Sequence, residues 1–236
     1  MAPDVRRTAA TLIAILIASP LAFPAGARAG ADVDAAEALA RTVYHEGVPY
    51  AEARKLTDAG AARLAEMLED PAEARHHAQI AEVLGMSGRA GAYEAITRAA
   101  AAKPTGEVDR ATLRTRVAVL AALGHLASSD DRALADLVAA AMTDGPAPAW
   151  RHGRLRGPRL AALLRRSALS GLALSGRTEA AGVLQQLLLD ARGARAGAGA
   201  PDLVRHLEAS LRLHGRVTRE GAEGVSRGAA FGGKKR

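Results

Sequence analysis

The sequence predicts an all-α protein, and three of its properties lead to this fold class. Apolar residues make up 49% of the chain and are mostly Ala and Leu, whereas aromatic residues make up 3%. Helices favour Ala and Leu, while strands favour β-branched and aromatic side chains. Apolar residues also recur at helical spacing along much of the chain, and several of these segments resemble one another.

Residues 1–29 form the first element and are typical of a secretory signal peptide. A basic start precedes an apolar run over 11–23, and the short sequence ARA ends at Ala29. The run is too short for a comfortable membrane span, so we predict a Sec-type signal that is cleaved after Ala29. An uncleaved N-terminal anchor is the alternative. The mature protein is expected in the periplasm or outside the cell.

The next segment, 31–47, is predicted to form an amphipathic helix that caps the N-terminal end of the domain. A terminal helix of this kind covers the apolar face that the first repeat would otherwise expose. Its inward residues, at helical spacing, are Ala36, Leu39, Ala40 and Val43.

A repeated unit follows this helix. The stretch AEVLGMSGRAGAYEAI at 81–96 matches LSGLALSGRTEAAGVL at 169–184, and weaker copies lie at 53–68, 120–137 and 207–222. Each copy predicts two helices joined by a tight turn, because an apolar stripe at helical spacing lies on both sides of a break. Neither helix of such a pair can bury its stripe alone, so successive pairs are expected to stack.

Glycines mark the predicted breaks. In the second unit we expect the first helix to end at Gly85. In four units we expect a left-handed glycine just past the first helix, where it ends a helix at little cost. These four residues are Gly60, Gly88, Gly176 and Gly215. The turn at each of them would fold the second helix back antiparallel to the first.

The triplets VLG at 83–85 and ALG at 122–124, each followed by a short turn and an apolar helix, resemble a marker of the HEAT repeat family. The short, Ala-rich version is most similar to the bacterial HEAT-like repeats of the phycobilisome lyase type. This resemblance implies a right-handed α–α superhelix, or solenoid, of about five helical hairpins over 30–220. The third and fourth units depart from the marker, with Ala173 and Arg212 in place of glycine.

Three insertions, at 102–110, 143–159 and 191–201, are predicted to interrupt the array. They are rich in Gly, Pro or Ala, a composition that favours loops and linkers. The C-terminal segment, 221–236, is Gly-rich and ends in Lys-Lys-Arg, so we predict a basic disordered tail there.

The search for catalytic and metal-binding patterns predicts neither an enzyme nor a bound cofactor or metal. The chain has no Cys, which excludes thiolate chemistry and Cys-ligated metals. The single His-Glu pair at 45–46 cannot supply the convergent ligands that a metal site needs. His76 and His77 are adjacent and would point about 100° apart on a helix. No phosphate-binding loop or nucleophile elbow is present.

Charge is distributed unevenly, with an excess of acidic residues over 30–145 and of basic residues over 146–236. Arginines cluster beside the only Trp, and both residue types are common at binding hot spots. This cluster would suit an acidic protein surface, a phosphate group or an anionic envelope lipid. A solvated loop without a function is the simpler interpretation. The candidate residues are Trp150, Arg151, Arg154, Arg156, Arg159, Arg165 and Arg166.

Together these features predict an exported, non-catalytic HEAT-repeat scaffold that binds a protein partner in the cell envelope. A nucleic-acid or anionic-surface binder is the alternative, because the C-terminal half is basic. Export and the scarcity of stacking aromatic residues argue against nucleic acid. Activity like that of the bilin lyases rests on the repeat resemblance alone and is the lesser alternative. Membrane contact is expected only through an uncleaved signal or an anionic surface.

Overall fold

The computed structural model describes residues 25–45, 47–101, 104–142, 148–193 and 200–231. Within these ranges the chain is built almost entirely from helices, and the prediction of an all-α fold is confirmed. Most of the predicted signal peptide lies outside the described residues. The elements are α1 (Ala25–Arg41), α2 (Tyr50–Arg54), α3 (Asp58–Glu69), the 3₁₀ helix η1 (Pro71–Glu73), α4 (His77–Ser87), α5 (Ala92–Ala101), β1 (Gly106–Glu107), α6 (Arg110–Leu126), α7 (Asp131–Met142), β2 (Trp150–Arg151), α8 (Gly157–Ser175), α9 (Thr178–Gly193) and α10 (Ala200–Phe231).

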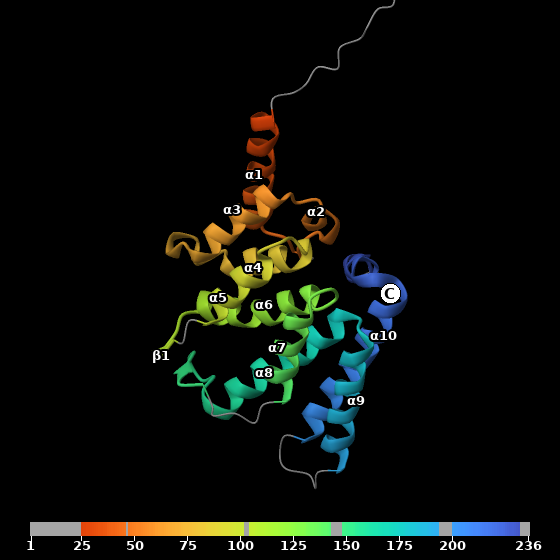
Figure 1. The fold of residues 1–236 in the computed structure, drawn as a ribbon. Helices are drawn as coiled ribbons and strands as arrows, with labels where there is room; N and C mark the ends of the chain where they lie inside the picture. Colours follow the sequence, from red (N-terminus) through yellow and green to blue (C-terminus); the bar gives the residue numbers. More distant parts are fainter. Residues whose placement is uncertain (1–24, 46, 102–103, 143–147, 194–199, 232–236) are drawn as a thin grey trace, which may run out of the picture.

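The helices stack in chain order, and Figure 1 shows them descending from α1 toward α9. One row consists of α4, α6, α8 and α10, and each of these helices contacts the next extensively. The other row consists of α3, α5, α7 and α9, whose members contact one another much less. We name the row of α4, α6 and α8 the inner row and the other the outer row, because the helices of the inner row are the more closely packed. The right-handed superhelix implied by the HEAT resemblance stays a prediction.

Glycines inside the helices permit the close spacing of the inner row. A Cβ atom on Gly85 of α4 would lie 2.6 Å from the Cα atom of Ala122 on α6. A Cβ atom on Gly124 of α6 would lie 2.6 Å from the carbonyl oxygen of Gly171 on α8. Main chain therefore packs directly on main chain where these helices cross. The predicted helix end at Gly85 is wrong, because α4 continues to Ser87 and uses this glycine for the crossing.

The left-handed turns predicted at Gly88 and Gly176 are confirmed. Their φ angles are 61° and 65°, and they end α4 and α8. In the first turn the hydroxyl of Ser87 donates to the carbonyl three residues earlier at 2.7 Å and accepts from the N–H of Arg89 at 3.3 Å. The second turn repeats both bonds with the same three residue types at 175–177. The repeated sequence SGR therefore forms the same turn twice.

The other two predicted turns are wrong. Gly60 lies inside α3, where a Cβ atom would be 3.2 Å from the Cβ of Ala36 on α1, so this glycine permits a close helix contact. Gly215 lies inside α10, which runs on to a kink at Gly221 with a φ of 73°. The fifth predicted hairpin is therefore one long helix. It stays helical through Gly215 because it packs along α8 and α9 and buries residues such as Leu207.

The prediction of a disordered tail from residue 221 is wrong for 221–231, which continue α10 after its kink. Val225 is only 8% exposed, so this part of the helix has apolar contacts that the Gly-rich composition does not suggest. Besides α8 and α9, α10 contacts α2, and Figure 1 shows the dark blue end of α10 on that side of the array. Residues 232–236 lie outside the described residues.

Two of the predicted insertions are joined to each other. β1, within 102–110, pairs in parallel with β2, within 143–159, so that Gly106 lies opposite Trp150. Strands of two residues carry no alternating pattern, and for this reason the sequence does not reveal the pairing. In the third insertion, α9 extends to Gly193 and α10 begins at Ala200. Parts of all three insertions lie outside the described residues.

The helix predicted over 31–47 is present as α1, but it ends at Arg41. Val43 lies beyond the helix end and is 77% exposed, so the predicted inward face is wrong at that position. The buried residues of α1 are Ala36, Leu39 and Ala40. All of them follow Ala29, so cleavage at the predicted position would leave these contacts in place.

Candidate functional site

A groove on the inner row is the first candidate for a binding site. It is open to solvent, has a volume of about 400 Å³, and is formed by α4, α6, α8 and the segment that follows α1. We name it the α4–α6–α8 groove. Its lining includes Tyr44, Gln79, Glu82, Arg114, Val117 and Leu163.

Helical spacing explains why these side chains meet. Ala78 and Glu82 are four residues apart on α4, and Leu113 and Val117 are four residues apart on α6, so each pair lies on one face of its helix. The glycine crossings bring the helices close together, and the faces therefore adjoin. The result is a surface of mixed apolar and polar side chains to which three helices contribute.

The segment between α1 and α2 forms one wall of the groove, and Gln79 fixes it. The side-chain amide of Gln79 donates to the carbonyl oxygens of Leu39 and Thr42, at 2.7 Å each. The last carbonyls of a helix have no partner within the helix, so this amide satisfies groups at the end of α1. Tyr44, which lines the groove, lies two residues after Thr42.

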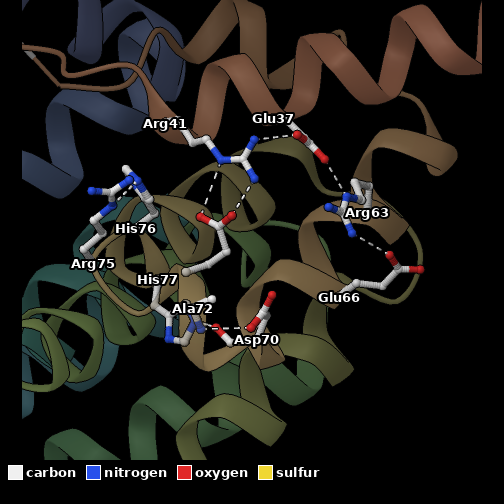
Figure 2. Close-up of polar contacts among 10 residues, drawn as sticks. Glu37, Arg41, Arg63, Glu66, Asp70, Ala72, Arg75, His76 and His77 are labelled. Atoms are coloured by element: carbon white, nitrogen blue, oxygen red, sulfur yellow. Dashed lines mark hydrogen bonds and ion pairs between the residues drawn. The ribbon is translucent and has the colours of Figure 1, made fainter.

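Ion pairs hold α1 against the array (Figure 2). The carboxylate of Glu37 accepts from Arg41 on its own helix and from Arg63 on α3, both at 2.6 Å. Arg41 also pairs with Glu73 of η1 at 2.5 Å. The hydrogen bond from Arg63, with that from Arg41, holds the pKa of the Glu37 carboxyl below its usual value. The wall of the groove thus depends on a helix that one carboxylate connects to α3.

Replacing Glu37 by Gln is expected to loosen α1 and the wall that follows it. The amide keeps the size of the side chain but removes the charge that two guanidinium groups share. Partly exposed ion pairs contribute on the order of 1 kcal/mol, so amide exchange over 30–48 should accelerate about fivefold. The control is Glu52→Gln on α2, which pairs only with Lys55 among the described residues. Equal exchange rates in both variants would contradict this role of Glu37.

Glu82 is the polar residue that stands out in the groove. It is partly buried, and no described residue donates a hydrogen bond to its carboxylate. Burial raises the pKa of the Glu82 carboxyl, and the positive charge of Arg114 opposes part of this rise. A carboxylate in such surroundings can accept hydrogen bonds from a donor that enters the groove. The sequence search passed over Glu82, although a single acid within the apolar run IAEVLG was a signal for it.

The seven residues predicted to form the basic binding surface do not stay together. Trp150 is 7% exposed and therefore cannot be its aromatic anchor. Arg151 pairs with Glu107 of β1, with 2.8 Å between Nε and Oε2. Arg165 donates from Nε to the carbonyl of Ala141 at 2.8 Å and is partly buried on α8, as is Arg166.

The remaining three candidates, Arg154, Arg156 and Arg159, lie together at the start of α8. They line an open hollow of about 910 Å³, which the described residues Gly153, Gly157 and Pro158 also line. All three side chains are exposed. We name them the arginine cluster, and it is the second candidate for a binding site.

Metal-binding groups do not assemble in the part of the chain that the structure describes. There, no group of three His, Asp or Glu side chains could hold a metal ion. The ring of His76 accepts from the neighbouring Arg75, and His77 Nε2 lies 2.8 Å from the carbonyl oxygen of Asp70. The predicted single pair at 45–46 lies partly outside the described residues, and His45 is exposed.

His125 lies near the C-terminal end of α6 and packs against α2. Its ring centroid lies 5.6 Å from that of Tyr50, with the planes tilted by 51°. The residue keeps some exposed surface, but its Nδ1 atom is enclosed without a hydrogen-bond partner among the described groups. Burial lowers the pKa of His125 to about 4. The imidazole is therefore neutral near pH 7.

No model of a known protein family matches the chain, and no curated protein matches its sequence. The HEAT resemblance and what it implies about function therefore stay predictions. Across the described helices, none combines the length and the apolar character that a membrane span needs.

Proposed function

We propose that this protein is a non-catalytic, exported scaffold that binds a protein partner in the α4–α6–α8 groove. The observation that carries the proposal is the partly buried Glu82 carboxylate, which no described residue supplies with a hydrogen bond. The carboxylate oxygens are not enclosed, so water can hydrate them while the groove is open, and a partner that covers them must replace that water with a donor. A partner that donates a hydrogen bond to Glu82 meets this requirement.

The shape of the groove favours a segment of another protein. It is open, it takes side chains from three stacked helices, and Val117 and Leu163 give it apolar walls. Stacked helix pairs present surfaces of this kind along their inner row. The lining also combines apolar side chains with polar ones such as Gln79, Glu82 and Arg114, as protein interfaces do.

The cellular setting is part of the same proposal. The basic start, the apolar run and the ARA sequence within 1–29 support a cleaved signal and export to the periplasm or the cell exterior. The SGR turns at 87–89 and 175–177 have the same geometry, which supports a HEAT-like array built from repeated hairpins. The cell envelope is therefore where we place the partner.

Peptides selected by display on the full chain test the proposal. We expect selected peptides to lose about tenfold in affinity for Glu82→Gln, because a hydrogen bond to a charged group is removed while the size of the side chain is kept. Leu163→Asp should weaken binding further, since it places a charge in the apolar wall. Fluorescence polarisation with labelled peptides measures both effects.

The matched control is Leu189→Asp on α9. Leu189 is 63% exposed and lies on the outer row, so this variant makes the same chemical change away from the groove. Thermal melts show whether Leu163→Asp still folds. The proposal fails if no peptide is enriched, or if Leu189→Asp weakens binding as much as the folded groove variants do.

A further inference from the structure

We propose that the arginine cluster is a second binding site, specific for a phosphate group. The site is separate from the α4–α6–α8 groove and does not depend on the function proposed for that groove. Its basis is three exposed arginine residues, Arg154, Arg156 and Arg159, that line one hollow.

The loop that carries the cluster is held in place on both sides. Its residues His152 and Leu155 exchange main-chain hydrogen bonds at 2.9 Å. The ring of His152 lies 2.9 Å from the carbonyl oxygen of Val108, and the buried Trp150 fixes the loop at its start. The arginines therefore stand on an ordered support, which limits the entropy that binding would cost.

No acidic side chain among the described residues pairs with the arginine cluster. Neither Arg154, Arg156 nor Arg159 makes a hydrogen bond or an ion pair with a described residue, and no acidic residue is among the described residues that line the hollow. The nearby Arg151 is different, because Glu107 neutralises it. Three like charges around one hollow repel one another, and an anion would relieve that repulsion.

The start of α8 adds to the same positive potential. Arg156 occupies the N-cap position and supplies no capping hydrogen bond, and the first turn of α8 contains no acidic residue. The N-terminal end of a helix carries a partial positive charge, which anions stabilise. The arginines and the helix end therefore favour the same kind of ligand.

The chemistry of the cluster favours phosphate over carboxylate. One guanidinium group is enough to match both oxygens of a carboxylate in a bidentate pair. Phosphate carries more charge and more acceptor oxygens, and it can use several planar guanidinium groups at once. Free phosphate, a phosphate ester and a phospholipid headgroup share this chemistry.

Titration of the full chain with inorganic phosphate tests the proposal. Chloride at the same ionic strength controls for screening, and calorimetry or NMR follows the binding. We expect saturable binding that the double variant Arg156→Gln/Arg159→Gln weakens about tenfold, since charge-assisted bidentate bonds are lost. The matched control is Arg212→Gln/Arg219→Gln, which removes two exposed arginines of α10.

Vesicles distinguish the sources of the phosphate group. Binding to phosphatidylglycerol vesicles but not to phosphatidylcholine vesicles, weakened by the cluster variant alone, would support a lipid headgroup. Binding of inorganic phosphate without binding to vesicles would support a small phosphate ligand. Absence of saturable phosphate binding would overturn the site. An equal loss of phosphate binding in both double variants would also overturn the site, because the attraction would then belong to the whole basic half. Equal binding of duplex DNA to both variants would likewise show an attraction to the whole basic half.

Discussion

Substituting Ala for Gly124 is expected to lower the free energy of unfolding by about 3 kcal/mol, in the upper part of the range for overpacked cores. The new Cβ atom would lie 2.6 Å from the carbonyl oxygen and 2.7 Å from the Cα atom of Gly171. Both are main-chain atoms, so no side chain can rotate to make room. α6 and α8 must separate, and apolar contacts along the inner row are lost as they do.

The neighbouring crossing shows why the strain cannot be relieved locally. A Cβ atom on Gly171 would itself lie 2.5 Å from the carbonyl oxygen of Leu120, so α6 and α8 touch at two points on the same face. On the other side, Gly85 of α4 packs on Ala122 of the same α6. Moving α6 away from α8 would press it into α4.

Gly182→Ala is the matched control for Gly124→Ala. Gly182 is an exposed residue of α9, and a Cβ atom there would meet nothing within 4 Å. Ala favours helix over Gly by up to about 1 kcal/mol, so this variant should be more stable than the wild-type protein. Urea denaturation followed by circular dichroism measures both changes. A stabilising effect of Gly124→Ala would show that the inner row is not in main-chain contact.

Acidification from pH 6.5 to pH 4 is expected to destabilise the protein through His125 by about 3 kcal/mol. The pKa of its buried imidazole is lowered from 6.5 to about 4, so between these values the unfolded chain binds a proton that the folded chain does not. The contribution to stability is fully present above pH 6.5, is lost as the pH falls, and levels off below pH 4.

The variant His125→Phe isolates this contribution. Phe keeps the ring that packs on Tyr50 and does not titrate, so the slope that His125 causes between pH 6.5 and pH 4 should disappear. Carboxylates such as Glu37, whose pKa is lowered by its arginine partners, still destabilise both proteins at lower pH. His45→Gln, at an exposed position, should retain the wild-type slope. Unfolding free energies from urea titrations at several pH values give the comparison; parallel curves for the wild-type protein and His125→Phe would refute the prediction.

The sequence was sufficient to predict the all-α fold and the turns at Gly88 and Gly176. In both cases one local signal decides the structure: helix-favouring composition in the first, a left-handed glycine after an apolar stripe in the second. Gly85 and Gly124 show where local reasoning fails. Within the sequence a glycine that breaks a helix looks the same as one that lets another helix approach, and only the neighbouring helix distinguishes them.

The candidate sites were predicted less well, because their formation depends on residues distant in the sequence. Trp150 and Arg151 belong to one apparent basic cluster, but the pairing of β2 with β1 buries the first and neutralises the second. Glu82 becomes a candidate binding residue only in the folded structure, where α6, α8 and the wall after α1 surround it. The members of the arginine cluster are neighbours in the sequence, and no distant residue among those described separates or neutralises them, so they lie together in the structure as well.

The glycine crossings of the inner row also limit how the groove can change. The width of the groove is set by the main-chain contacts between α4, α6 and α8. A change of side-chain rotamer cannot alter the distance between these helices. Substituting residues such as Val117 or Leu163 would change which ligands the groove binds, while the width of the groove would stay constant. A bound segment must therefore adapt its own shape to a rigid groove. Related proteins would change their binding preference by substituting the side chains that line the groove, while the helix spacing stays the same.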